Sequence, residues 1–266
     1  MATRIGLITT GDCEHRALPG SLRRFFKEID VEFVSVGARC SDSVTSRHLT
    51  YPAPTTGVPT LVDKLVARMT AEIERRDAPD FVVVIDDLEL VNRATPQDVV
   101  ALFRDSARRQ LAQAPTHRRA ERFQQRCSFH LFAPMLEAYF FGEPAALTRA
   151  GAKGPAFLDP TRPLEDFMSA DIAYLASTTS ALDAQHPKLY LRFLAAPGGY
   201  RETKGGCAAL ETLDWSQVFR HPADRLEFAC SLFDDLCDAL EVVSPLPTRG
   251  TQHLTARRSG GVMRNL

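Results

Sequence analysis

The sequence has no long hydrophobic run: no stretch approaches the roughly 18 uninterrupted apolar residues that a membrane-spanning helix needs. Gly11 and Asp12 interrupt the short apolar run near the start, which is therefore too brief for a secretory signal peptide. The net charge is only -1, so any nucleic-acid contact would have to come from a local patch. We expect a cytoplasmic protein.

The chain also lacks several common signatures of function. Its six cysteines include no Cys-x-x-Cys pair, which argues against a structural zinc site, and a chain of this size does not need a disulfide framework. A Walker A loop, a dinucleotide-binding fingerprint and a nucleophile elbow are absent. What is present is an ordinary globular composition, 44% hydrophobic and 24% charged over 266 residues, which is enough for a substantial core.

The clearest predicted element is a strand at 81–85, which reads Phe-Val-Val-Val-Ile and is apolar on both faces, as in a parallel sheet. Pro19 suits the first turn of a helix, where a missing N–H costs nothing. Periodicity predicts further strands at 4–10, 31–36 and 128–132, and further helices over 61–73, 97–112 and 223–243. This order predicts an α/β fold with a mostly parallel sheet covered by helices on both faces.

Three regions differ in composition. Residues 1–150 hold the predicted strands and form the α/β core, and residues 151–245 are mainly short helical pieces that we expect to pack on it. Residues 246–266 contain four arginines and no acid, and we expect a flexible basic tail there.

Acidic residues follow two of the predicted strands. Glu14 lies in a short polar turn after the first strand, and Asp86, Asp87 and Glu89 directly follow the strand at 81–85. In a parallel α/β sheet, ligands gather at the carboxyl ends of the strands, so these side chains converge if the two strands are neighbours. Clustered carboxylates resist ionisation unless a cation neutralises them, and Mg²⁺ prefers such oxygen ligands. The alternative is that these acids cap helices or face water.

The motifs around these acids resemble a known family. Gly11-Asp12-Cys13-Glu14 is similar to the opening motif of Toprim proteins, and Val83 to Glu89 is similar to their second motif, an apolar strand ending in Asp-x-Asp. Three later stretches also fit, namely 134–139, 186–188 and 200–206. Over roughly residues 4 to 240, the chain resembles a bacterial Toprim-like family of unknown function, related to the OLD-family Toprim nucleases and found in defence-type gene neighbourhoods.

The resemblance implies a Toprim-type Mg²⁺ (or Mn²⁺) site of the kind used to cut or rejoin nucleic acid. Glu14 would be a metal ligand or general acid/base, and Asp86 and Asp87 would hold the metal. The register stays open. The family's Asp-x-Asp aligns either as Asp87 with Glu89, which keeps two acids, or as Asp86 with Leu88, which implies a degenerate site.

Two other groups of residues are candidates for function. Glu137 lies in an apolar stretch, where it either pairs with an arginine or joins the metal site. The densest basic stretch is the first choice for a nucleic-acid contact, although a charge run also forms an ordinary solvated face. The nucleic-acid candidates are Arg104, Arg108, Arg109, Arg118, Arg119 and Arg122, together with Lys188 and Lys204 from the family motifs.

These observations lead to two hypotheses. The first is a Mg²⁺-dependent DNA nuclease of Toprim type, an antiviral or anti-plasmid defence effector that works with an ATPase of the RecF or SMC kind. The second is a catalytically degenerate Toprim-fold subunit that binds a partner protein or nucleic acid. RNA as substrate and a homo-oligomeric state stay open, and a small-molecule phosphotransfer or phosphatase enzyme would require a closed pocket.

Overall fold

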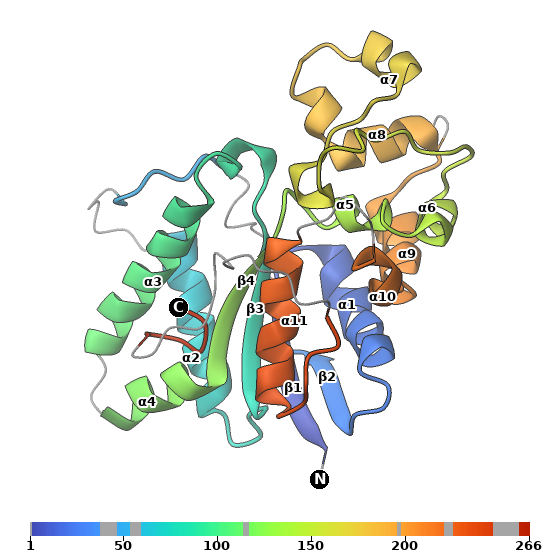
Figure 1. Cartoon of the computed structure of the whole chain (residues 1–266). Helices are drawn as coiled ribbons and strands as arrows, with labels where there is room; N and C mark the ends of the chain where they lie inside the picture. The colour runs from blue at the N-terminus through green and yellow to red at the C-terminus, as the bar shows by residue number, and fades with distance from the viewer. Residues whose placement is uncertain are drawn as a thin grey trace.

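The computed structural model describes residues 2–37, 47–53, 60–113, 117–195, 198–220, 226–246 and 261–266. At its centre lies a four-stranded, all-parallel sheet in the order β2-β1-β3-β4 (Figure 1). The strands are β1 (Thr3–Thr9), β2 (Val31–Ser35), β3 (Phe81–Asp87) and β4 (Cys127–Phe132). The predicted parallel α/β fold is confirmed, and β1 and β3 are neighbours, with Thr9 paired to Ile85.

Helices cover both faces of the sheet, because the central strands are apolar on both faces. On one face, α1 (Asp12–Phe25) and α11 (Glu227–Ala239) share a core with Val83 and Ile85. On the other face, Val82 and Val84 belong to a second core with α2 (Leu61–Glu74), α3 (Pro96–Ala112) and Phe123 of α4 (His117–Arg126). The alternation along β3 assigns odd-numbered residues to the α1 face and even-numbered residues to the α2 face.

Short helices follow β4 and lie over the carboxyl ends of the strands (Figure 1). They share the first core with α1 and α11; for example, the buried Trp215 donates a 2.8 Å hydrogen bond from Nε1 to Ser21 Oγ. The α-helices are α5 (Glu137–Phe140), α6 (Pro144–Ala150), α7 (Ile172–Ser177), α8 (Pro187–Leu194), α9 (Cys207–Glu211) and α10 (Trp215–Val218). The other helical turns are η1 (Leu90–Asn92), η2 (Leu164–Asp166), η3 (Asp183–Gln185) and η4 (Glu202–Gly206).

Over the described ranges, none of the helices combines the length and the apolar character that crossing a membrane requires.

Helix α1 begins earlier than predicted. It starts at Asp12, so Pro19 lies inside the helix and not in its first turn. Proline has no N–H to give to the carbonyl four residues back, which here belongs to His15. The His15 carbonyl instead accepts a hydrogen bond from Ser35 Oγ of β2, so a side chain replaces the missing backbone donor.

The end of the chain is also different from the flexible tail that we expected over 246–266. Residues 247–260 lie outside the described part, but residues 261–266 pack along the edge of β4, with Met263 and Leu266 buried. The Arg264 N–H donates to Cys127 O at 2.8 Å, and Arg264 forms an ion pair with Asp235 at 2.9 Å. An edge strand offers unpaired backbone groups, and this segment satisfies some of them on β4.

We predict that Asn265→Ala destabilises the fold by about 1–3 kcal/mol, because it leaves a buried backbone N–H and C=O unpaired. Asn265 Oδ1 accepts from Phe129 N at 3.1 Å, and its Nδ2 donates to Phe129 O at 2.6 Å. Urea unfolding measures the change, and Gln125→Ala on an exposed position of α4 is the control. Equal stabilities of the two variants would contradict the docking of this segment.

Candidate functional site

The carboxyl ends of β1 and β3 place several acids together. Glu14 lies in the first turn of α1, which follows β1 after a single short turn, and not in a loop before the helix as predicted. Asp86 and Asp87 are the last two residues of β3, whereas the sequence prediction placed them after the strand. Together with Glu89 and Glu137, they form what we call the acidic cluster.

Glu14 is the best-defined member of the cluster. Its side chain is 8% exposed, and within the described part of the chain its Oε2 atom is buried without a hydrogen-bond partner. The carboxylate lies so close to Gly11 that a Cβ atom at position 11 would be 2.0 Å from Oε2. The glycine of the Gly-x-x-Glu turn therefore makes room for the carboxylate itself.

Burial raises the pKa of Glu14 to about 8. This value includes the upward effect of the Glu137 and Glu202 charges and the downward effect of its own backbone N–H and of Lys188. A carboxyl group in this position keeps its proton near neutral pH unless an additional positive charge is bound next to it.

Asp86 and Asp87 point to opposite faces of the sheet. Asp87 follows the odd-numbered residues toward α1, accepts a 2.9 Å hydrogen bond from Leu136 N, and lies near Glu14 and Glu137. Asp86 follows the even-numbered residues and accepts from Thr10 Oγ1. Burial raises the pKa of Asp87 well above its ordinary value, and the charges of Glu14 and Glu137 are the next causes.

This alternation bears on the open register of the second motif. Leu88 is buried in the core of the α2 face together with Val82 and Val84, so position 88 contributes no ligand. The charge of Glu89 raises the pKa of Asp87, and the charges of Asp86 and Glu137 raise the pKa values of both Asp87 and Glu89. Asp86 therefore acts on the same groups, and both alignments of the motif stay open.

Glu89 has an unusual backbone. Its φ of 62° and ψ of 151° fall in a region that is essentially restricted to glycine, and its N–H donates to Pro134 O at 2.7 Å. Burial raises the pKa of its carboxyl group to about 7, with further contributions from Asp86 and Glu137. A strained, non-glycine residue that carries a perturbed acid is typical of a functional site.

Lys188, in the helical C-terminal part, supplies a positive charge beside the acidic cluster. Glu137, at the start of α5, is 4% exposed, lies 3.4 Å from Lys188 Nζ and accepts a 2.9 Å hydrogen bond from Tyr200 Oη. Lys188 also forms an ion pair with Glu202. Burial lowers the pKa of Lys188, but Glu137 and Glu202 raise it to a net value above the ordinary one. Glu137 therefore forms an ion pair, as one of its two predictions stated, but with a lysine instead of an arginine. That it joins a metal site stays a prediction.

Sequence reasoning missed two parts of this arrangement. Glu202 was not proposed, and Lys188 was placed among nucleic-acid contacts instead of inside the acidic cluster. The stretches 186–188 and 200–206, which carry the resemblance to the Toprim-like family, were the available signal for both.

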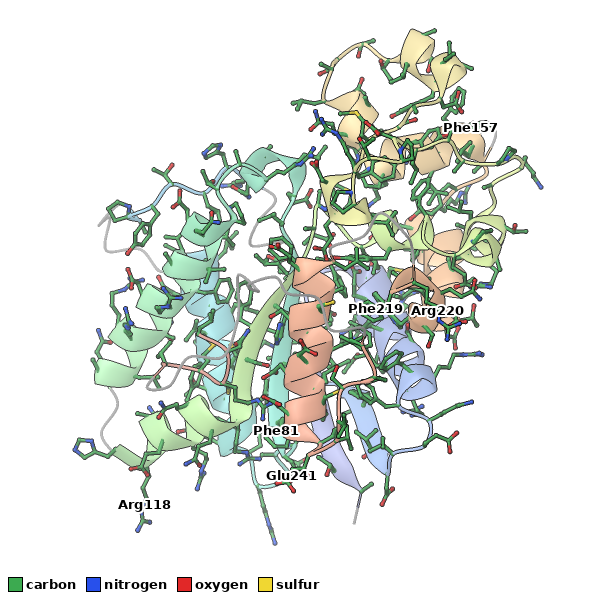
Figure 2. All side chains as sticks on the ribbon, viewed as in Figure 1. Phe81, Arg118, Phe157, Phe219, Arg220 and Glu241 are labelled. Carbon is green, nitrogen blue, oxygen red and sulfur yellow. The ribbon has the colours of Figure 1, made fainter. Side chains whose placement is uncertain are left out.

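The arginine stretch lies elsewhere. Helix α4 leads into the amino end of β4, whereas the acidic cluster lies at the carboxyl ends of β1 and β3. Figure 2 shows Arg118 projecting from the amino end of the sheet. Several of these arginines are engaged: Arg108 with Asp105 at 3.4 Å, Arg109 with Asp63 at 2.9 Å, and Arg119 with Glu74. Arg118 and Arg122 are exposed, and Arg104 is half-buried on α3. Lys204 is exposed on η4, near α1.

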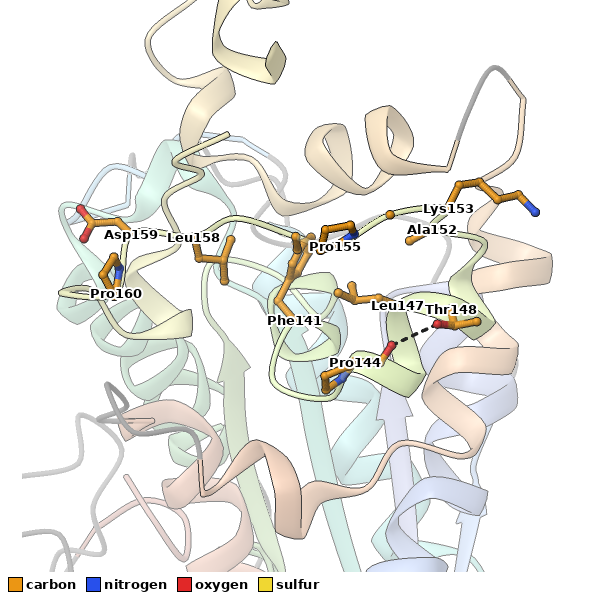
Figure 3. A pocket seen from close by; sticks show the side chains of 12 residues that line it. Phe141, Pro144, Leu147, Thr148, Ala152, Lys153, Pro155, Leu158, Asp159 and Pro160 are labelled. Atoms are coloured by element: carbon orange, nitrogen blue, oxygen red, sulfur yellow. Dashed lines mark hydrogen bonds between the residues drawn. The ribbon is translucent and has the colours of Figure 1, made fainter. Parts of the chain in front are cut away.

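A separate pocket of about 790 Å³ lies between α6 and the segment 152–160 (Figure 3). Its lining is mostly apolar, with Phe141, Leu147 and Leu158 among the wall residues and Lys153 and Asp159 as its charged members. The acidic cluster does not contribute to this wall, so the cluster itself is not enclosed by this pocket.

The donor chemistry of the cluster fits Mg²⁺ or Mn²⁺, because its groups are hard carboxylate oxygens and one buried oxygen of Glu14 has no partner among the residues that the structure describes. Among the described residues, however, no three His, Cys, Asp or Glu side chains are already placed to hold a metal ion. The residue types are thus suited to Mg²⁺ or Mn²⁺, but their side chains would have to move to coordinate the ion.

Comparisons with protein-family models, with curated proteins and with solved structures find no match to this chain.

The raised pKa of Glu14 predicts a definite pH dependence of stability. Between about pH 4.5, the ordinary pKa of Glu, and pH 8, the folded state binds more protons than the unfolded chain, so stability falls as pH rises. Glu14→Gln should flatten this fall, whereas Glu28→Gln, at an exposed position of the α1–β2 turn, should not. Urea unfolding at pH 5, 6, 7 and 8 without divalent cations is the measurement, and parallel curves for both variants would refute the assignment.

The backbone of Glu89 gives a second prediction. Glu89→Gly removes the acid and the strain, and Glu89→Ala removes the acid alone, so the glycine variant should be more stable than the alanine variant by about 1 kcal/mol. Both variants are compared by thermal and urea unfolding. An alanine variant as stable as the glycine variant would show that position 89 is not strained.

Proposed function

We propose that this chain is a Mg²⁺-dependent nuclease of Toprim type, which hydrolyses phosphodiester bonds in DNA. The observation that carries the proposal is the acidic cluster at the carboxyl ends of β1 and β3, where burial and mutual repulsion raise the pKa values of Glu14, Asp87 and Glu89. The cluster carries more carboxylates than Lys188 alone can neutralise, and a divalent cation would supply the additional positive charge.

Within this proposal, Glu14, Asp87 and Glu89 are the principal ligands, with Glu137 and Asp86 beside them. When bound, the ion polarises a phosphoryl oxygen and lowers the pKa of its coordinated water. Lys188 pairs with Glu137 and Glu202, and Tyr200 orients Glu137 through its hydroxyl group. Gly11 leaves the Glu14 carboxylate free to reach the site.

The wider setting of the proposal rests on the resemblance to the Toprim-like family. It comprises a cytoplasmic defence effector, a partner ATPase of the RecF or SMC kind, and DNA as substrate. Arg118 and Arg122 are exposed and available for phosphate contacts, but α4, which carries them, leads into the amino end of β4, whereas the acidic cluster lies at the carboxyl ends of β1 and β3. A duplex that touches both would have to extend along the molecule, so Lys204 on η4 is the better candidate for a contact beside the cluster.

A second candidate is a degenerate Toprim-fold subunit that binds a partner protein or nucleic acid without cleaving it. The ion pairs of Lys188 with Glu137 and Glu202 favour this candidate, because they already compensate part of the charge with a side chain. In that case the cluster would serve as a buried structural network.

We expect the protein to degrade plasmid DNA with Mg²⁺ or Mn²⁺, alone or with its ATPase partner. Glu14→Gln should lower the rate by about 100-fold or more if Glu14 acts as general acid or base. Asp87→Asn should abolish Mn²⁺ binding as measured by calorimetry. The matched control is Asp77→Asn, at an exposed site in the α2–β3 connection.

Retention of cleavage in both variants would show that the site is elsewhere. The nuclease assignment fails if no metal supports cleavage with or without the ATPase. Salt-dependent DNA binding without cleavage would then select the second candidate.

A further inference from the structure

Two cysteines meet beside the acidic cluster. Cys13 occupies the first turn of α1, one residue before Glu14, and Cys207 is the first residue of α9. Both are free thiols, and each is close enough to the other to affect its pKa. The sequence places them almost 200 residues apart, and the scattered cysteines gave no sign of a pair.

The packing of α1 against α9 keeps the two thiols together. These helices lie side by side over the edge of the sheet (Figure 1). Gly206 sits immediately before Cys207, and a Cβ atom at position 206 would lie 3.6 Å from Cys13 Sγ and 2.9 Å from Tyr200 Oη. The glycine thus permits a close approach of α9 to both Cys13 and Tyr200, the hydroxyl donor to Glu137.

The two thiols differ in access. Cys13 is 2% exposed, whereas Cys207 is only half-buried, so an oxidant in solution reaches Cys207 first. Burial raises the pKa of the Cys207 thiol above its ordinary value, and Cys13 and Arg16, which is exposed on α1, partly offset this rise. An accessible sulfur next to a buried resolving thiol is the usual arrangement of an oxidation-sensitive pair.

We propose that Cys13 and Cys207 form a disulfide when the protein meets a peroxide, and that this bond disables the acidic cluster. The Cys207 thiolate attacks one peroxide oxygen, the O–O bond breaks, and Cys207 becomes a sulfenic acid as water leaves. The sulfur of Cys13 then attacks that of Cys207 and releases a second water. In total, two thiols lose two electrons and two protons, and hydrogen peroxide is reduced to two water molecules.

The consequence for the cluster follows from geometry. A disulfide brings two sulfurs to about 2.05 Å, much closer than two unbonded thiols can approach, so the first turn of α1, the start of α9 or both have to shift. Glu14 is the next residue, and its carboxylate already fills the space above Gly11. The inhibitory effect rests on the proposed metal site, whereas the disulfide itself does not.

The test uses the whole protein, treated with hydrogen peroxide or with dithiothreitol and then digested without reduction. Mass spectrometry should find a Cys13–Cys207 peptide pair that dithiothreitol removes. Cys207→Ser should abolish the pair, and Cys127→Ala, a buried cysteine of β4, should leave it intact. Circular dichroism and thermal unfolding check that both variants fold.

Mn²⁺ titration by calorimetry then compares the oxidised and reduced protein, and we expect binding at least about tenfold weaker after oxidation. Cys207→Ser should show no such loss after the same peroxide treatment. Thiols that stay reduced, or a Cys207 bond to Cys40, would overturn the disulfide. A disulfide with unchanged Mn²⁺ affinity would overturn its effect on the cluster. Mn²⁺ binding that is absent in the reduced protein would instead count against the proposed function, and the peptide map would still decide the disulfide.

Discussion

The repulsion among carboxylates at one edge of a parallel sheet is the constraint on which this structure depends. The topology brings Glu14 and Asp87 together, because β1 and β3 are neighbours and end at the same edge. Burial strengthens the repulsion, since little water is available to screen it. The protein meets this cost in two ways: Lys188 compensates Glu137 and Glu202, and the raised pKa values of Glu14 and Glu89 allow these groups to stay protonated.

The helical C-terminal part is tied to this constraint. It contributes Lys188 and Tyr200 to the acidic cluster, and its aromatic side chains share a core with α1, so the cluster cannot be separated from it. Arg93, just after Glu89, forms an ion pair with Asp166 of η2 and thereby connects the loop after β3 to the same region. A metal, if bound, would therefore lie between two parts of one packed unit, where small movements of α1, α5 or α8 change the distances between ligands.

The apolar periodicity predicted most of the fold. The strand at 81–85 was recognisable because both faces are apolar, and α2 and α3 were recognisable because one face is. The start of α1 was missed because Pro19 signals a first turn, whereas in the structure Ser35 of β2 satisfies the His15 carbonyl that Pro19 leaves without its helical donor. Residues 261–266 were missed because their partners, Asp235 and the edge of β4, are distant in sequence.

The candidate site was predictable in part. The position of the acids after predicted strands identified Glu14, Asp86, Asp87 and Glu89. The predicted strand ended at residue 85, so the sequence did not show that Asp86 and Asp87 belong to β3 and face opposite sides of the sheet. Lys188 was predicted to contact nucleic acid, because nothing local in the sequence reveals its ion pairs with Glu137 and Glu202. The central claim is that the cluster keeps protons that a divalent cation replaces. Calorimetric titration of Mg²⁺ or Mn²⁺ at pH 7, in two buffers of different ionisation enthalpy, measures this directly. Release of about one proton per bound ion is the predicted result, and binding without proton release, or no binding, would contradict the account.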